Sequence, residues 1–355
     1  MKDQPFIYNL EHSDLISILT ELGEPSYRAK QIWQGLYKQY WNTPDEFTNL
    51  PKSLREKLNQ VIRFETLKPV KYLDSSDEQT RKTLFQLHDN RLIEAVLMKY
   101  DPSTHKGHGR RTLCISSQAG CAMGCVFCAT GQMGFKRNLT SGEIVAQVMY
   151  YARMLHAQDE SVTNIVLMGM GEPFHNYDNV MAAIDRLNDS DGYNFGARRF
   201  TISTVGLVPK IRQFADEKRQ VNLAISLHAA DDEERGSIMP VNKKHNISKL
   251  LEACRYYVDQ TGRRITFEWA LISGVNDTED VAHKLATRLK GLMCHVNAIP
   301  LNPTTGYQGQ ATTRQSAAKF KETLEQAGIP CRIRMRRGID IQAGCGQLAG
   351  SVVFG

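Results

Sequence analysis

The spacing of apolar positions changes along this chain from helical, to alternating, to a regular succession of the two. Residues 14–22, 26–41 and 53–62 carry apolar side chains at helical spacing, and Ser26 is a predicted helix cap. These stretches predict a small helical domain over residues 1–65. Apolar runs at 82–87 and 92–100 then predict two strands and a turn within a connector over residues 66–106, which ends in a polar loop.

Six runs that are typical of strands, each followed by a run typical of a helix, make up the next part of the chain. The strand runs cover residues 113–117, 164–171, 200–205, 221–228, 265–272 and 295–302, and the helix runs cover residues 142–155, 179–187, 209–217, 247–258, 279–292 and 317–328. Thr140 and Glu143 form a predicted capping box at the first of these helices. A last strand is predicted over residues 331–337.

This succession predicts an α/β fold. The economical architecture is a partial or full parallel β/α barrel over residues 107–345, with its site at the carboxyl ends of the strands. A short tail over residues 346–355 follows the barrel. A doubly wound open sheet is the alternative fold.

Composition and charge narrow the class of protein. The chain has 355 residues and a formal net charge of +6, a mild lean toward a polyanionic partner. No apolar run has the length of a membrane span and the N-terminus lacks the pattern of a secretory signal, so we expect a cytoplasmic protein with no membrane contact. Eight cysteines in such a chain favour metal or thiol chemistry over a disulfide framework.

Three of these cysteines, Cys121, Cys125 and Cys128, stand in a glycine-bearing loop after the first barrel strand. Three thiolates can hold an iron–sulfur cubane and leave one iron open to bind a small molecule, which indicates catalysis. A structural zinc site is the alternative, and it requires a fourth Cys or His at a matching spacing. The C-x3-C-x2-C spacing, with Phe127 before the last cysteine, resembles the signature of radical SAM enzymes, which bind a [4Fe-4S] cluster and S-adenosylmethionine (SAM).

Polar residues recur at the predicted strand ends, where a parallel barrel places its site. The segment Gly-Met-Gly-Glu-Pro follows the second barrel strand, and Ser-Leu-His ends the fourth. The resemblance to radical SAM enzymes implies that such residues bind SAM, with a glutamate and backbone groups receiving its methionine ammonium. The predicted SAM-binding residues are Gly171, Glu172, Ser203, Ser226, Leu227, His228 and Asn297.

Two further cysteines suggest covalent chemistry. Cys345 lies in a glycine-flanked segment, and Cys114 precedes the triplet on a predicted strand, where a buried apolar role would otherwise be expected. If one thiol carries a group covalently, the other can resolve the resulting thioether.

These cysteines and the segments Gly-Met-Gly-Glu-Pro, Ser-Leu-His, Asn-Pro-Thr-Thr-Gly and Gly-Ile-Asp-Ile-Gln-Ala-Gly-Cys-Gly-Gln-Leu-Ala-Gly resemble, over essentially the whole chain, the adenine methyltransferases of large-subunit ribosomal RNA. Pro173 and Arg336-Arg337-Gly338 favour the dual-specificity branch. That branch methylates adenine C2 in 23S rRNA and in tRNA beside the anticodon. The sister branch, which methylates C8, is the alternative.

The resemblance implies roles for individual residues. Cys345 would be methylated by one SAM, and a radical from a second SAM would activate that methyl group for attack on C2. Cys114 would then cut the thioether by forming a disulfide with Cys345. Glu94 would act as the base, although the segment between Glu94 and Cys114 is several residues longer than is usual in the family. Implied partners are 23S rRNA, tRNA and an electron donor such as flavodoxin or ferredoxin, and a monomer is the default.

A basic run precedes the Cys345 segment. Arg332, Arg334 and Arg336 alternate with apolar residues on the last predicted strand, so they share a face that could bind RNA phosphates. The helical domain could add RNA contacts, although Trp33 and Tyr37 are more simply core residues. Rival functions are a different radical SAM reaction, an electron-transfer iron–sulfur protein, and a zinc-stabilised RNA-binding module.

Overall fold

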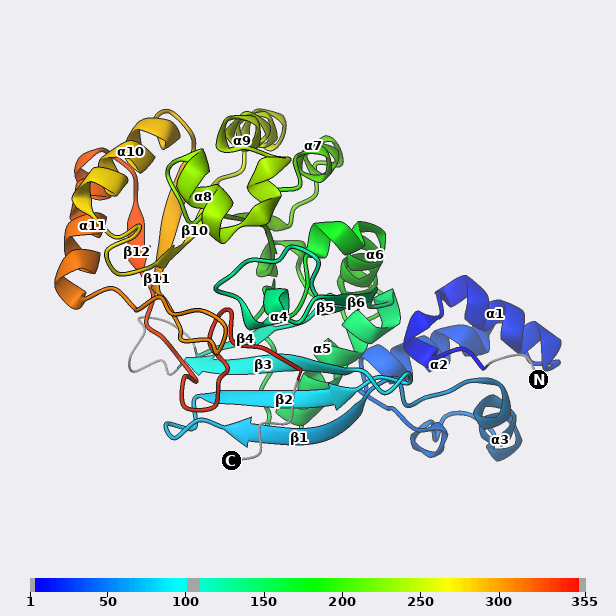
Figure 1. Cartoon of the computed structure of the whole chain (residues 1–355). Helices are drawn as coiled ribbons and strands as arrows, with labels where there is room; N and C mark the ends of the chain where they lie inside the picture. Colours follow the sequence, from blue (N-terminus) through cyan, green and yellow to red (C-terminus); the bar gives the residue numbers. More distant parts are fainter. Residues whose placement is uncertain (1–3, 101–108, 351–355) are drawn as a thin grey trace.

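A computed structural model describes residues 4–100 and 109–350 of the chain, and one ten-stranded sheet forms its frame (Figure 1). In spatial order the strands are β1 (Lys68–Asp74), β2 (Thr80–Gln86), β3 (Leu92–Tyr100), β4 (Arg110–Cys114), β7 (Asn164–Leu167), β8 (Phe200–Thr204), β9 (Asn222–Ser226), β10 (Ile265–Leu271), β11 (Cys294–Pro300) and β12 (Cys331–Ile333). β1 to β4 pair antiparallel, and the pairs from β4 through β12 are parallel. A separate hairpin joins β5 (Gln118–Gly120) and β6 (Phe135–Asn138).

The parallel strands follow one another across the sheet in chain order, which is the arrangement of a barrel. A doubly wound sheet would instead reverse its order at a switch point. Within the described ranges β12 pairs with β11 alone, so the barrel is open. The helices of the crossovers are α5 (Ser141–His156), α6 (Tyr177–Asn188), α7 (Val208–Asp216), α8 (Asp232–Ile238), α9 (Ile247–Thr261), α10 (Glu279–Leu289) and α11 (Arg314–Gln326). The predicted partial barrel is confirmed.

Of the local features predicted from the sequence, one helix cap is confirmed, and another cap and the end of the last strand are wrong. The capping box at α5 is confirmed, because the Thr140 hydroxyl accepts from the Glu143 N–H and the Glu143 carboxylate accepts from the Thr140 N–H. The cap at Ser26 is wrong, since this residue already has helical dihedral angles and its side chain makes no capping hydrogen bond. The last strand also ends at Ile333 rather than at residue 337, so only its first part extends the sheet.

The connector contains three strands instead of two. The additional strand β1 escaped prediction because it is an edge strand whose side chains are mostly exposed, which removes the alternation of apolar and polar positions. Most of the polar loop predicted after β3, residues 101–108, lies outside the described residues. Where the connector ends thus stays a prediction.

Three helices form a smaller lobe beside the barrel, α1 (His12–Glu21), α2 (Tyr27–Tyr37) and α3 (Lys52–Val61) (Figure 1). Trp33 and Tyr37 are buried, as their simpler interpretation requires. The Trp33 indole N–H donates to the Asp189 carboxylate at 2.7 Å, and the buried Arg186 donates to the Tyr8 carbonyl. The lobe is therefore fixed to the barrel by polar contacts as well as by a shared apolar core. No helix among the described residues is long and apolar enough to cross a bilayer.

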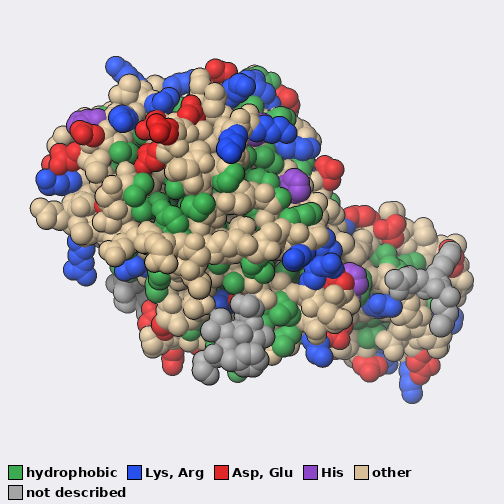
Figure 2. Space-filling view, in the orientation of Figure 1, with side chains coloured by type: hydrophobic (Ala, Val, Ile, Leu, Met, Phe, Trp, Pro, Cys, Tyr) green, Lys and Arg blue, Asp and Glu red, His purple; other side chains and the backbone are tan. Residues whose placement is uncertain are grey.

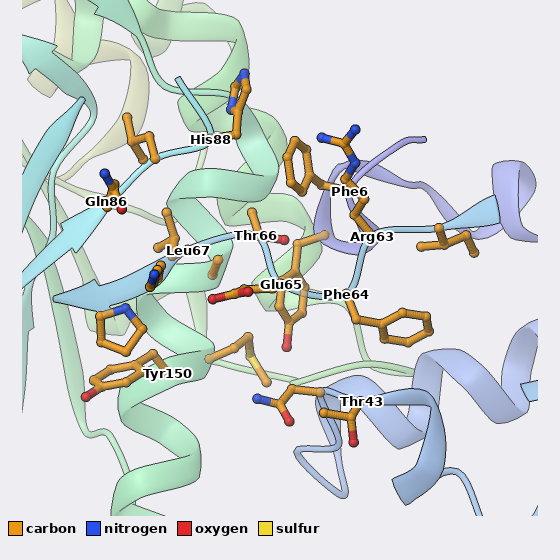
Figure 3. A pocket seen from close by; sticks show the side chains of 18 of the residues that line it. Phe6, Thr43, Arg63, Phe64, Glu65, Thr66, Leu67, Gln86, His88 and Tyr150 are labelled. Atoms are coloured by element: carbon orange, nitrogen blue, oxygen red, sulfur yellow. The ribbon is translucent and has the colours of Figure 1, made fainter. Parts of the chain in front are cut away.

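A groove of about 970 Å³ lies between this lobe and the sheet (Figure 3). Phe6 stands in it between the Arg63 guanidinium, 5.6 Å from the ring centroid, and the His88 ring, with 5.2 Å between the two ring centroids. Figure 2 shows Lys and Arg side chains gathered near the junction of the two lobes. Aromatic and basic side chains thus meet on an accessible surface.

Candidate active site

A cavity of about 170 Å³ opens at the carboxyl ends of the barrel strands. Its walls come from the loop of three cysteines, from several strand ends and from the C-terminal segment. The side chains and backbone groups of chemical interest in its lining belong to Cys121, Cys125, Cys128, Gly171, Glu172, Ser203, Ser226, His228, Glu268, Asn302 and Cys345. The fold thus gathers most of the predicted site residues around one space.

The loop between β5 and α4 (Ala129–Gln132) presents the three cysteines. Cys121 follows β5 directly, and Cys128 is the residue before α4. The turn into the loop depends on Gly120, which has a φ of +73° and where a Cβ atom would lie 2.0 Å from the Gly134 carbonyl oxygen. Only glycine fits this position, so the hairpin sets where the thiols begin.

The donor set of this loop fits an iron–sulfur cubane. All three thiols line the cavity, and burial raises the pKa of Cys121 to about 12 and raises that of Cys125 as well. Such thiols stay protonated until a metal displaces the protons. Among the described residues, no three His, Cys, Asp or Glu side chains converge tightly enough to hold a single metal ion. Three thiols on one loop at one cavity are the donor set that a [4Fe-4S] cubane with one open iron requires.

Glu172 brings a buried carboxylate to the cavity. Its oxygens accept hydrogen bonds from the backbone N–H groups of Phe174 at 2.9 Å and Val205 at 2.8 Å. Burial nevertheless raises the pKa of Glu172 to about 7. A carboxylate that lacks a cationic partner in these contacts can receive the ammonium group of a ligand.

The next strand ends contribute neutral hydrogen-bonding groups. The hydroxyl oxygens of Ser203 and Ser226 lie 3.4 Å apart. His228 accepts the Ala270 N–H at Nδ1, so the neutral ring carries its proton on Nε2. Burial lowers the pKa of His228 to about 3, which keeps it neutral at physiological pH. Leu227, which is fully buried, does not line the cavity.

The sixth strand reaches the cavity differently from the prediction. Asn297 lies in the middle of β11 and does not line the cavity; its amide donates to the Glu268 carboxylate at 3.0 Å. Asn302, just beyond the strand, does line it. The Asn302 amide donates to the Cys345 carbonyl at 3.0 Å, while its buried Oδ1 has no partner among the described residues. A donor on a bound SAM molecule would satisfy this oxygen.

Cys345 is the exposed cysteine of the described chain, and its surface faces the cavity. Desolvation of the thiol inside the cavity, together with the charge of nearby Glu268, raises the pKa of Cys345 to about 11. Backbone contacts fix its loop, because the Gly346 carbonyl accepts the Ala129 N–H at 2.7 Å and the Leu348 carbonyl accepts the Thr130 hydroxyl at 2.6 Å. The C-terminal segment is thus tied to the helix that follows the cysteine loop.

Cys114 is buried at the end of β4 and is outside the cavity lining. Burial raises the pKa of Cys114, and the charge of a Cys345 thiolate adds to the effect. The two sulfurs therefore lie within electrostatic range of each other. Both are free thiols, so the disulfide between them stays a prediction.

Glu94 is buried away from the cavity and secures the C-terminal segment. One carboxylate oxygen lies 3.0 Å from the Lys82 ammonium, and the other accepts the backbone N–H groups of Ala349 at 2.8 Å and Gly350 at 3.1 Å. Lys82 also donates to the Gln342 carbonyl at 3.2 Å. We refer to Lys82 and Glu94 as the tail clamp, because together they hold both ends of the Cys345 segment.

Comparison with known proteins supports the same chemistry. Residues 115–285 match the radical SAM superfamily, and residues 7–64 match the N-terminal domain of ribosomal RNA large subunit methyltransferases. A dual-specificity RNA methyltransferase RlmN from Myxococcus xanthus is 47% identical over 98% of this chain and 94% of its own length. A probable dual-specificity RNA methyltransferase RlmN from Bacillus velezensis is 45% identical over 98% of this chain and 93% of its own. The chain belongs to the RlmN family.

A solved structure supports the RlmN assignment. A radical SAM methyltransferase from Sphaerobacter thermophilus superposes with a TM-score of 0.93 and 47% identity, covering 98% of this chain and 99% of that one. RlmN proteins are radical SAM RNA methyltransferases, and the superfamily implies a [4Fe-4S] cluster and SAM. This membership excludes the rival electron-transfer and zinc-module functions.

Three residues of the site were missed from the sequence. Glu268 sits within an apolar strand, where an isolated acid is itself a signal, and burial raises its pKa. Asn302 is the first residue of the Asn-Pro-Thr-Thr-Gly segment, so its position after a strand end could have been predicted from the sequence. Arg235 lies in a run of charged residues that looks like a solvated helix, and nothing in the sequence marks it as buried.

Arg235 holds the backbone near several strand ends of the RlmN site through hydrogen bonds. Its guanidinium donates to the carbonyl oxygens of Val205, Ser226, Leu227 and His245 and to the side chain of Asn242. Burial lowers the pKa of Arg235 to about 10, so it remains charged at neutral pH.

We expect Arg235→Met to reduce the free energy of unfolding by about 3 kcal/mol or more, since it leaves several buried acceptors without donors. Thermal or denaturant unfolding measures this loss. The control is Arg212→Met on the exposed face of α7, where the guanidinium lies 5.1 Å from the Tyr256 ring centroid and its loss should cost no more than about 1 kcal/mol. Equal stability of the two variants would show that Arg235 does not hold the strand ends.

Proposed function

We propose that the protein methylates C2 of adenosines in 23S rRNA and in tRNA, through a methyl group carried on Cys345. The observation that carries this proposal is that the Cys345 thiol faces the cavity that Cys121, Cys125 and Cys128 also line. A thiol there can hold a methyl group beside the place where a radical would be generated. The relatives named dual-specificity RNA methyltransferases support the choice of substrates.

The target atom explains why a carrier is needed. C2 of adenine is an electron-poor carbon with an unactivated hydrogen, so it cannot take a methyl cation from SAM in a polar reaction. When bound, the cluster and SAM supply a carbon-centred radical that can remove a hydrogen atom from a methyl group. Cys345 would hold that methyl group, and the anchored loop would orient it. Two SAM molecules are then consumed per turnover, one to methylate Cys345 and one to activate the methyl group.

Release of the product requires a second thiol. After the carbon–carbon bond has formed, RNA remains joined to Cys345 through a thioether. Radical addition to C2 leaves an unpaired electron on the ring, so an electron acceptor and a base must first remove one electron and the C2 proton. Attack by the Cys114 thiolate on the Cys345 sulfur would then break the sulfur–carbon bond. The electron pair of that bond stays on the carbon, which takes up a proton and becomes the methyl group, and the two sulfurs are left as a disulfide that an external reductant must reduce. The high pKa that burial gives Cys114 means that a base or a local rearrangement must precede this attack.

We expect Cys114→Ala to stop turnover after the RNA has been attached to the protein. The variant should form a covalent adduct with RNA that survives denaturing electrophoresis, because no thiolate remains to cut the thioether. Peptide mass spectrometry should locate the RNA on Cys345. Release of methylated RNA at the unmodified rate would contradict a role for Cys114.

The family resemblance supports Glu94 as the proposed base that takes the C2 proton. It would have to exchange its backbone contacts with Ala349 and Gly350 for a position nearer the substrate, so catalysis would involve movement of the tail. Glu268 is a buried carboxylate that already lines the cavity next to Cys345. If Glu268→Gln rather than Glu94→Gln blocked proton loss, Glu268 would be the base.

RNA must approach the barrel mouth with its target base turned out of the helical stack. Arg332 and Arg336 are exposed near the C-terminal segment, and the groove between the two lobes offers Phe6, Arg63 and His88. Phosphate and stacking contacts on these groups would offset the cost of unstacking.

We further propose that the protein acts as a cytoplasmic monomer reduced by flavodoxin or ferredoxin.

The experiment that tests this function identifies the product. The anaerobically reconstituted protein is incubated with SAM, a reductant and either a 23S rRNA fragment or unmodified tRNA, and the digested RNA is compared with methyladenosine standards by mass spectrometry. We expect 2-methyladenosine from both RNAs. Formation of 8-methyladenosine would assign the protein to the sister activity, and methylation of neither RNA would overturn the proposed function.

A further inference from the structure

A second pocket, of about 600 Å³, lies at the opposite end of the barrel from the cavity. It is formed at the amino ends of β8, β9, β10 and β11 and shares no lining residue with the cavity. Three of its lining residues are arginines, Arg198, Arg263 and Arg264, and one is His295. None of the described residues that line it is acidic. We refer to it as the basic pocket.

Neutral amides, rather than carboxylates, hold two of the three arginines of the basic pocket. The Gln220 side-chain oxygen accepts from Arg198 at 3.2 Å and from Arg263 at 3.2 Å. The Asn222 side-chain oxygen accepts from Arg263 at 2.7 Å. Amide oxygens fix the guanidinium groups without cancelling their charge. The nearby Arg219, in contrast, pairs with the carboxylates of Asp185 and Glu217.

Two buried nitrogens of the basic pocket also lack hydrogen-bond partners among the described residues. Arg263 Nε, which is a donor, and His295 Nδ1, which donates in the tautomer that carries the proton there, are buried and have no hydrogen-bond partner among the described residues. Buried donors without partners are rare, because each costs its desolvation free energy, and an anion or ordered water normally accounts for them. Preorganised guanidinium charge together with a buried unpaired donor is what an oxyanion site requires.

We propose that the basic pocket binds a phosphate group. A phosphate has enough acceptor oxygens for several arginines at once, and the planar fork of a guanidinium matches its geometry. The phosphate can come from an RNA backbone or from a small phosphate compound, and both sources use the same contacts. Because the basic pocket lies at the opposite end of the barrel from the cavity, a phosphate bound there would strengthen binding of the molecule that carries it without contacting the reacting atoms.

Thermal unfolding of the full-length reconstituted protein tests this site, with inorganic phosphate as the probe and chloride at equal ionic strength as the reference. Phosphate should raise the unfolding midpoint of the unmodified protein. Arg264→Gln should weaken phosphate binding about tenfold, and Arg263→Gln should do the same. Arg264 is exposed and makes no hydrogen bond or ion pair with the described residues, so its variant should fold normally. The control Arg212→Gln removes the same charge from an exposed site on α7 and should respond like the unmodified protein.

Binding of labelled tRNA to the same proteins separates the two sources. If the RNA backbone supplies the phosphate, Arg264→Gln should weaken tRNA binding and reduce its salt dependence by about one ion. Unchanged tRNA binding together with a lost phosphate response assigns the pocket to a small phosphate compound. A midpoint that phosphate does not raise, or an equal rise in all variants, would overturn the site. None of these readouts depends on methylation activity.

Discussion

Replacing Cys345 by alanine is expected to abolish RNA methylation while leaving SAM cleavage intact. The thiol is the proposed carrier of the methyl group, so its loss should reduce methylated RNA by about a thousandfold or more. The loop should keep its shape, because its contacts to Ala129 and Asn302 use the carbonyl groups of Gly346 and Cys345. Methylated RNA and 5′-deoxyadenosine are measured in the same reaction.

The matched control is Cys331→Ala, which removes a buried thiol at the start of β12, outside the cavity. This variant should lose some stability and still methylate RNA. If Cys345→Ala also methylated RNA, direct transfer from SAM would replace the carrier mechanism. If it failed to cleave SAM as well, the loop rather than the thiol would account for the loss.

Replacing Lys82 by methionine is expected to be the most destabilising change in the tail clamp. The substitution leaves the Glu94 carboxylate buried without its cation, which should cost about 3–5 kcal/mol of free energy of unfolding. Because Glu94 also binds the backbone at Ala349 and Gly350, the Cys345 segment should loosen. Hydrogen exchange should then report faster exchange over residues 342–350, together with reduced methylation.

A double variant separates charge from geometry at the tail clamp. Lys82→Met with Glu94→Gln removes both charges and should recover much of the stability that the single variant loses. Lys99→Met is the control, because Lys99 forms a partly exposed ion pair with Glu160 at 3.9 Å and should change stability by less than about 1 kcal/mol. Equal stability of Lys82→Met and Lys99→Met would show that the clamp does not hold the tail.

The barrel could be predicted from the sequence because its signals are local. Each parallel strand is an apolar run followed by an amphipathic helix, and the capping box at Thr140 marks a helix start without any tertiary information. The edge strand β1 and the end of β12 depend instead on exposure at the border of the sheet. The whole of β1 and the true end of β12 were therefore missed, as was the conformation of Ser26.

The site was predictable where residue type and spacing carry the chemistry. The triplet Cys121, Cys125 and Cys128 is such a pattern, as is the placement of serines at strand ends. Arg235, in contrast, acts through five acceptors brought together only by folding. The contacts of Glu94 depend on the course of the C-terminal segment, which crosses back to β2 and β3, and no local pattern encodes that path (Figure 1).

The central claim, that Cys345 carries the methyl group to adenine C2, is tested most directly by an isotope chase. The protein is loaded using SAM with a deuterated methyl group, freed of that SAM, and given RNA with unlabelled SAM for a single turnover. Peptide mass spectrometry first verifies a labelled methyl group on Cys345. Our account predicts that the 2-methyladenosine of this turnover carries deuterium, whereas an unlabelled methyl group on the RNA would contradict it.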